Sequence, residues 1–204
     1  MKRSLFVLLL AGAMLTAVSV ARATVIHLHA QLSGANEVAP TPSAGTGFAT
    51  LDLDTVTNIL TGHIEFSGLT GVTTASHIHC CLGFPYANGV NVGVATLVPA
   101  FPGFPIGVSS GIDDFVLDLN LASSYNNGAA IFPALGGFLL AQGSLANAEA
   151  AFISGLLSGK TYLNIHTNVF PGGEIRGFVA PEPATLALLG LGLAGLGFGR
   201  RKKA

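Results

Sequence analysis

Residues 59–66 read ILTGHIEF, a stretch in which apolar and polar side chains alternate. One set of alternate positions, apolar apart from a glycine, consists of Leu60, Gly62, Ile64 and Phe66. The polar positions between them are Thr61, His63 and Glu65. Because successive side chains of a strand point to opposite faces of a sheet, this alternation predicts a half-buried antiparallel β-strand.

The same period of two recurs along the chain, at residues 26–32, 47–54 and 161–167. Other segments of strand-like composition predict four further strands, at residues 76–80, 92–97, 112–121 and 174–179. Clusters of Gly, Pro, Asn and Ser separate these segments, as is typical of turns. The pattern therefore predicts an all-β fold, either an antiparallel β-sandwich or a barrel.

One segment, residues 144–157, departs from the strand pattern and predicts a short helix. It is rich in alanine, and Leu145, Phe152 and Leu156 recur at the spacing of one helical face. Ser144 is a favoured residue for the N-cap, and Gly159 is a favoured residue just beyond the end of a helix.

Charge is distributed unevenly along the 204 residues, whose formal net charge is −1. Residues 24–180 contain two basic residues, Lys160 and Arg176, against nine acidic ones, a net charge of −7. The other basic residues lie near the two ends of the chain. An acidic body argues against nucleic acid as a partner, because phosphate backbones are bound by clustered Lys and Arg.

The first 23 residues have the organisation of a secretory signal peptide. Lys2 and Arg3 precede an uncharged run over residues 4–21, and Ala21-Arg22-Ala23 fits the A-x-A cleavage pattern. A permanent membrane anchor is the alternative, since the uncharged run just reaches spanning length. The cleavage pattern favours removal, and export then proceeds through the Sec machinery.

The other end of the chain has three parts in a fixed order. Pro181-Glu182-Pro183 comes first, the uncharged residues 184–199 follow, and a basic cluster with Arg200 and Arg201 ends the order. Sixteen residues of helix span about 24 Å, slightly less than a hydrocarbon core of about 30 Å. The basic cluster is expected to stay in the cytoplasm, so this segment predicts a short membrane helix.

The order Pro-Glu-Pro, apolar helix and basic end closely resembles the PEP-CTERM sorting signal of Gram-negative bacteria. The resemblance covers residues 181–204. It implies processing by an exosortase near Pro181-Glu182-Pro183, and therefore membrane attachment through the C-terminal helix that is at least transient. The mature protein would then be at the outer surface of the envelope or extracellular.

Residues 24–180 resemble the CHRD domain, which is named for chordin and also occurs in exported bacterial proteins. The stretches that carry the resemblance are Leu32–Val38, Ser76–His79, Tyr162–Thr167 and Phe170–Gly177. It implies an Ig-like β-barrel that is loosely related to the fold of copper/zinc superoxide dismutase. It implies no defined activity. Cys80-Cys81 departs from the usual family pattern, which has glycine after the His-x-His motif.

The histidines are the candidate metal ligands. His77 and His79 lie two apart on a predicted strand, so their rings point to the same side, and His166 lies on a similar polar face. Three imidazoles suffice for a copper or zinc site, with His63 as a candidate fourth ligand. Alternatively, the three rings form a buried hydrogen-bonding network. The second His-x-His motif, His27-Leu28-His29, is expected to be exposed beside the signal peptide.

Cys80 and Cys81 are the only cysteines of the chain. In an oxidising compartment cysteines usually pair, so a disulfide between these two neighbours is the favoured interpretation. Free thiols, metal-binding thiolates and intermolecular disulfides remain as alternatives.

Arg176 is one of only two basic residues in the predicted domain, so we expect it to pair with a carboxylate. Glu37 and Glu174 are the candidates, and Glu174 lies two residues away on the same predicted strand. Such an ion pair would join the first and last strands of the domain.

Together, the targeting segments and the β-domain predict an exported cell-envelope or extracellular protein. The sequence shows no arrangement of nucleophile and base, which favours a non-enzymatic binding or matrix module. Its expected partners are the exosortase and an extracellular polysaccharide or matrix protein. The alternative is a copper- or zinc-binding protein for redox chemistry or metal storage.

Overall fold

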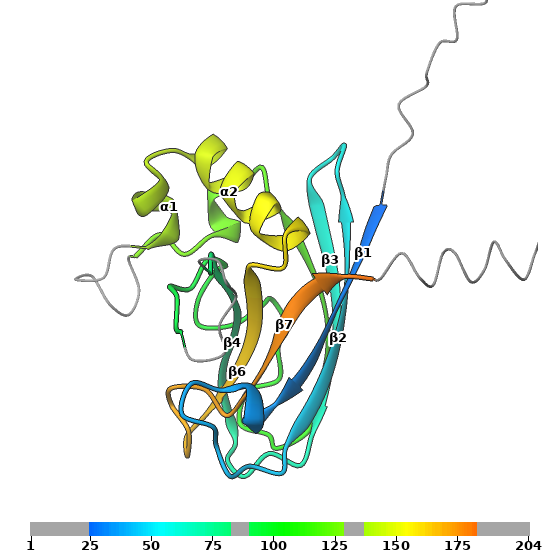
Figure 1. Ribbon diagram of the computed structural model, residues 1–204, viewed down its shortest axis with the longest axis vertical. Coiled ribbons are helices and arrows are strands. Elements are labelled where there is room, and N and C mark those ends of the chain that lie inside the picture. The colour runs from blue at the N-terminus through cyan, green and yellow to red at the C-terminus, as the bar shows by residue number, and fades with distance from the viewer. Residues whose placement is uncertain (1–24, 83–89, 129–136, 183–204) are drawn as a thin grey trace, which may run out of the picture.

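The computed structural model describes residues 25–82, 90–128 and 137–182. Within them, seven strands form one antiparallel sheet, curled like half a barrel (Figure 1). The strands are β1 (Val25–Ser33), β2 (Thr46–Asp54), β3 (Ile59–Ser67), β4 (Thr73–Cys80), β5 (Gly111–Asp118), β6 (Thr161–Thr167) and β7 (Ile175–Pro181). Across the sheet they are arranged in the order β4-β6-β7-β1-β2-β3-β5. The all-β prediction is confirmed.

One face of the sheet carries the apolar core, as the alternation predicts. In β3, Leu60 and Ile64 are fully buried while Thr61 and Glu65, on the other face, are exposed. The aromatic rings of the segment between β4 and β5 close this core, where Phe104 stacks on Phe66 and Phe101 on Phe115. Burying these side chains is the main favourable contribution to folding.

Gly62 in β3 lies opposite Phe115 of β5, and a Cβ at residue 62 would overlap the Phe115 ring. We expect Gly62→Ala to lower the free energy of unfolding by about 1–3 kcal/mol, because the added methyl must displace a packed ring. Denaturant unfolding measures this loss. Gly172→Ala is the control, since a Cβ at residue 172 meets nothing within 4 Å. Equal losses in both variants would contradict the prediction.

The helices lie at the end of the sheet where β6 begins (Figure 1). They are α1 (Phe138–Gln142) and α2 (Leu145–Leu157), with short 3-10 turns η1 (Gly34–Asn36) and η2 (Ala122–Ser124) elsewhere. The helix predicted at residues 144–157 is thus confirmed, and the Ser144 hydroxyl caps it by accepting a hydrogen bond from the Asn147 backbone N–H at 3.1 Å. Its buried face packs Phe152 and Leu156 onto the core.

The strand predicted at residues 92–97 is wrong. This segment makes only isolated bridges, because its backbone hydrogen bonds are divided between two neighbours. The Ala95 N–H donates to the Ile78 carbonyl of β4, whereas the Leu97 N–H donates to Ser124. The segment instead runs beside the outer edge of β4 and covers part of it, which matters for the histidines on that strand.

The predicted signal peptide, 1–23, and the predicted membrane helix, 184–199, lie outside the described residues. Among the described helices, none has the length and hydropathy needed to cross a bilayer.

Candidate functional site

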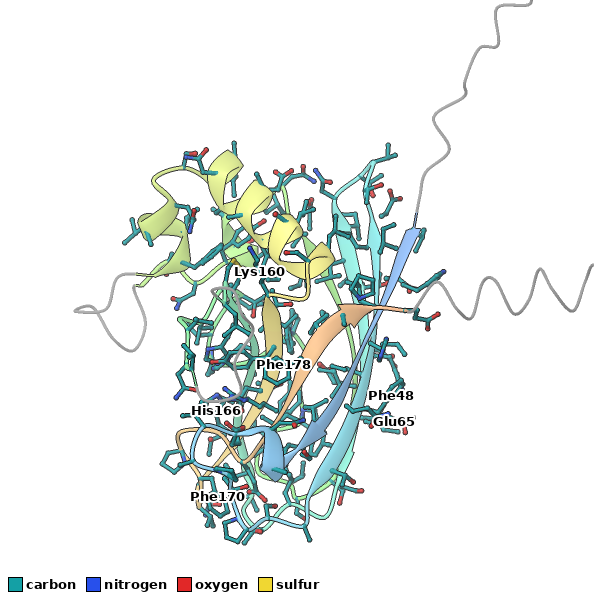
Figure 2. All side chains as sticks on the ribbon, viewed as in Figure 1. Phe48, Glu65, Lys160, His166, Phe170 and Phe178 are labelled. Carbon is teal, nitrogen blue, oxygen red and sulfur yellow. A yellow bond between two sulfur atoms is a disulfide. The ribbon has the colours of Figure 1, made fainter. Side chains whose placement is uncertain are left out.

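His77, His79 and His166 come together on the face of the sheet opposite the apolar core. β4 and β6 are neighbours, with Ala75 opposite His166 and His77 opposite Asn164. His166 is therefore diagonal to His77, and Figure 2 shows it on β6. The candidate ligand nitrogens of the three rings all lie within 4.8 Å of one another. Strand pairing thus brings one distant residue beside the His-x-His motif.

Two backbone carbonyls orient these rings. The Nδ1–H of His79 donates to the Val92 carbonyl at 2.7 Å, and the Nδ1–H of His166 donates to the Pro171 carbonyl at 2.9 Å. Because a carbonyl only accepts, each neutral ring must carry its proton on Nδ1 and a lone pair on Nε2. Metal-binding histidines are commonly held in this way by a second partner.

Each ring also leaves one buried nitrogen without a hydrogen-bond partner among the described residues. These atoms are Nδ1 of His77 and Nε2 of both His79 and His166. Unpaired buried polar atoms are costly, and they commonly mark a place where a ligand or ion binds. The arrangement therefore fits a metal better than the alternative of a hydrogen-bonding network that satisfies every ring.

Burial keeps the three imidazoles neutral. Burial, with repulsion from the neighbouring rings, lowers the pKa of His77 to about 2. Burial lowers the pKa of His79 to about 4 against the opposing effect of its bond to Val92, and it also lowers the pKa of His166. Because only the neutral ring has a lone pair to give, the cluster is in the ligand state throughout the neutral pH range.

A cavity of about 910 Å³ opens beside the cluster, and we call it the histidine cleft. The three histidines and the Cys80–Cys81 pair border it, together with an apolar wall formed by Val94, Val98, Phe138 and Ala141. The wall comes from the segment that follows the edge of β4 and from α1. The three candidate metal ligands are therefore reachable from a volume much larger than a water molecule.

The other histidines do not join the cluster. His63 is on β3, which pairs with β2 and β5, and its ring contacts Asp114 at 2.6 Å and Glu65 at 3.1 Å. The expectation of His63 as a fourth ligand is thus wrong, because four strands separate β3 from β4 in the sheet. His27 is largely exposed and contacts Asp52 at 2.6 Å.

Cys80 and Cys81 are joined by a disulfide, the pairing that the sequence favours. The two sulfur atoms face α2, with the Cys81 Sγ 3.6 Å from the Ala151 carbonyl oxygen. Gly155 of α2 makes room for the pair, since a Cβ there would lie 2.6 Å from the Cys80 Sγ. The disulfide therefore packs against α2 at the end of β4.

Arg176 is fully buried on β7, and its Nε lies 4.0 Å from a carboxylate oxygen of Glu37. Its Nη1 donates to the Asn91 side chain at 3.1 Å. Burial raises the pKa of Glu37 to about 7, although Arg176 and Asn164 oppose the rise. Glu37 ends η1, the turn that follows β1, so this pair links that turn with β7. From the sequence we expect an ion pair between the first and last strands themselves.

The expected pairing of Arg176 with Glu174 is wrong. Glu174 precedes the first residue of β7, so the rule that residues two apart share a face does not apply to it. Its carboxylate accepts hydrogen bonds from the hydroxyls of Ser43 and Thr167 and from the Thr70 and Gly71 backbone. Burial acts to raise the pKa of Glu174, but these bonds hold it below its ordinary value.

Tyr162 connects the ion pair to the histidines, a role for which the sequence carries no signal. Its ring stacks on His79 with the centroids 4.5 Å apart and an interplanar angle of 11°. The Arg176 guanidinium lies 4.6 Å from the centroid of the same ring. In the sheet, Tyr162 pairs with His79 on one side and with Phe178 on the other. Arg176 therefore supports the histidine cluster through the Tyr162 ring.

The first residues of the sorting motif belong to the sheet. Pro181 ends β7 opposite Leu28, and the Glu182 N–H donates to the His27 carbonyl at 3.1 Å. The domain therefore continues into the motif without a linker. Pro183, Arg200 and Arg201 lie outside the described residues.

Comparison with known families gives two matches. The CHRD domain matches residues 28–179, and the PEP-CTERM protein-sorting motif matches residues 179–203. No curated protein and no solved structure shows significant similarity to the chain. The motif indicates export, exosortase-mediated processing and attachment at the envelope before display at the surface. The chain belongs to the CHRD domain family and carries a PEP-CTERM sorting motif at its C-terminal end.

Proposed function

We propose that this exosortase-sorted protein is a binding module that holds one copper or zinc ion at His77, His79 and His166. The supporting observation is the set of three buried, unpartnered nitrogens within 4.8 Å of one another. We further propose that residues 1–23 are removed during export, so that the domain reaches an oxidising compartment. That location is consistent with the disulfide between Cys80 and Cys81.

The donor set determines which metals fit. Three imidazole nitrogens suit Cu²⁺ and Zn²⁺, whereas Mg²⁺ and Ca²⁺ prefer oxygen ligands. Nε2 is the donor atom of His79 and His166, because a carbonyl holds their Nδ1–H. The unpartnered Nδ1 is the donor atom of His77. Three protein ligands leave at least one further position on the ion for water or another ligand.

Metal stoichiometry tests this function. The full chain would be produced with its own export signals, purified through a tag without histidine, stripped with chelator and titrated with Cu²⁺ or Zn²⁺ by calorimetry. The proposal expects one ion per chain. If no ion binds even at high metal concentration, the proposed metal site is refuted. The conclusions on export and processing would stand, because they rest on the sorting motif.

Acid should release the metal only at low pH. An exposed histidine has a pKa near 6.5, so protons begin to displace a metal from it near that pH. Burial lowers the pKa of His79 to about 4 and that of His77 to about 2. Protons therefore compete weakly with the metal above about pH 5. We expect the ion to remain bound on dialysis at pH 5.5. Loss of the ion with a midpoint near pH 6.5 would contradict burial of the ligands.

A further inference from the structure

The histidine cleft is larger than a metal ion alone requires. Structural zinc sites are closed by four protein ligands, whereas sites that bind a further molecule keep an open position. Here the three ring nitrogens border a cavity of about 910 Å³. That volume is at the upper end of the range of about 300–1,000 Å³ for small-molecule sites. The cleft therefore has room for a molecule on the open side of the ion.

The charges around the cleft favour an anion at the open position. Imidazole is a neutral ligand, so the three rings cancel none of the charge of a divalent ion. The described residues that border the cleft include no Asp, Glu, Lys or Arg. Two of the ligands, His77 and His79, are buried, where an uncompensated charge is costly. A bound anion would reduce this cost.

The apolar wall of the cleft favours an apolar body on that anion. Val94, Val98 and Phe138 present hydrocarbon to the cleft, and Ala141 adds a methyl group at its exposed border. A small hydrated anion would leave this surface in contact with water. A molecule that covers about 80 Å² of it gains roughly 30-fold in affinity.

From these observations we propose that the histidine cleft binds a small carboxylate with an apolar body, such as an aromatic ring. The carboxylate oxygen occupies the open position of the ion, and the apolar body lies against Val94, Val98 and Phe138. This inference rests on the proposed metal site, because the ion supplies the only positive charge at the cleft among the described residues.

Benzoate and acetate are the probes. The full chain loaded with Cu²⁺ would be titrated with each, and the change in the copper absorption spectrum would give the two dissociation constants. We expect the dissociation constant of benzoate to be at least about tenfold lower than that of acetate, since only the ring covers the apolar wall. The metal-free protein is expected to bind neither.

Introducing a negative charge on α1 tests whether benzoate binds in the histidine cleft. Ala141→Glu puts a carboxylate at the border of the cleft, and we expect it to weaken benzoate binding about fivefold or more by repulsion. Leu140→Glu is the matched control, because Leu140 is on the same helix, is 67% exposed and does not border the cleft. Leu140→Glu should leave both copper and benzoate affinities unchanged.

The outcomes separate this inference from the metal site itself. Absence of bound copper overturns the metal site and, with it, the inference. Copper binding with equal affinities for benzoate and acetate, or with neither bound, overturns only the carboxylate proposal. Benzoate binding of equal strength without copper overturns anchoring by the ion. Equal effects of Ala141→Glu and Leu140→Glu overturn the placement of the ligand in the cleft.

Discussion

Replacing His79 by alanine is expected to lower the affinity for Cu²⁺ or Zn²⁺ by more than 100-fold. Loss of a residue that only orients a ligand typically costs about 10–100-fold, so loss of a ligand should cost more. His79 is also the most firmly oriented ring, held by the Val92 carbonyl and stacked on Tyr162. Calorimetric titration of the metal-free variant measures the change.

His27→Ala is the matched control for this variant. His27 belongs to the other His-x-His motif, but its side chain is 62% exposed and contacts Asp52 rather than the cluster. We expect this variant to bind one ion with the affinity of the unmodified protein. Equal loss in both variants would contradict the site, and so would unchanged binding in His79→Ala. Circular dichroism of both variants checks that the fold is retained.

Replacing Arg176 by methionine is expected to lower the free energy of unfolding by about 3–5 kcal/mol. The substitution keeps much of the side-chain volume but leaves Glu37 buried without its cation. It also removes the guanidinium that lies over the Tyr162 ring. Denaturant unfolding at pH 8 measures the loss.

Lys160→Met is the control, because it removes the other basic residue of the domain and changes the net charge equally. Lys160 makes no ion pair within the described residues, so we expect a loss of less than about 1 kcal/mol. Equal losses in the Arg176 and Lys160 variants would contradict the buried ion pair.

The loss in Arg176→Met should also depend on pH. Burial raises the pKa of Glu37 to about 7 even beside Arg176, and removing the cation raises it further. In the folded variant Glu37 therefore keeps its proton at a pH where Glu37 of the unfolded chain, with a pKa of about 4.5, has lost it. Because the folded state binds more protons, the free energy of unfolding of the variant falls as the pH rises. We expect the deficit to be smaller at pH 5 than at pH 8, and a deficit independent of pH would argue against Glu37 as the cause.

Alternation in the sequence predicts most of the strands because one face of the sheet is an apolar core. Residues 59–66 alternate throughout, and β3 occupies Ile59–Ser67. Residues 92–97 are apolar enough for a strand, but tertiary contacts with both β4 and Ser124 override their preference. Local pattern identifies an extended segment, whereas its hydrogen-bond partners depend on the whole fold.

The candidate site, too, can be predicted from local sequence only in part. Spacing alone places His77 and His79 on one face, but only the pairing of β4 with β6 shows that His166 joins them and that His63 does not. The carbonyls of Val92 and Pro171 orient two rings and have no signature in the sequence, since every residue has a carbonyl. The spacing of Glu174 and Arg176 does not put them on one face, because β7 begins one residue after Glu174.

The number of histidine nitrogens on the bound ion decides whether the protein has a three-histidine metal site. Pulsed electron paramagnetic resonance of the full chain, loaded with one equivalent of Cu²⁺, counts the imidazoles coordinated to copper. The three-histidine site predicts three, falling to two when His166 is replaced by alanine. One imidazole in the unmodified protein, or an unchanged count in the His166 variant, would contradict a metal centre at His77, His79 and His166.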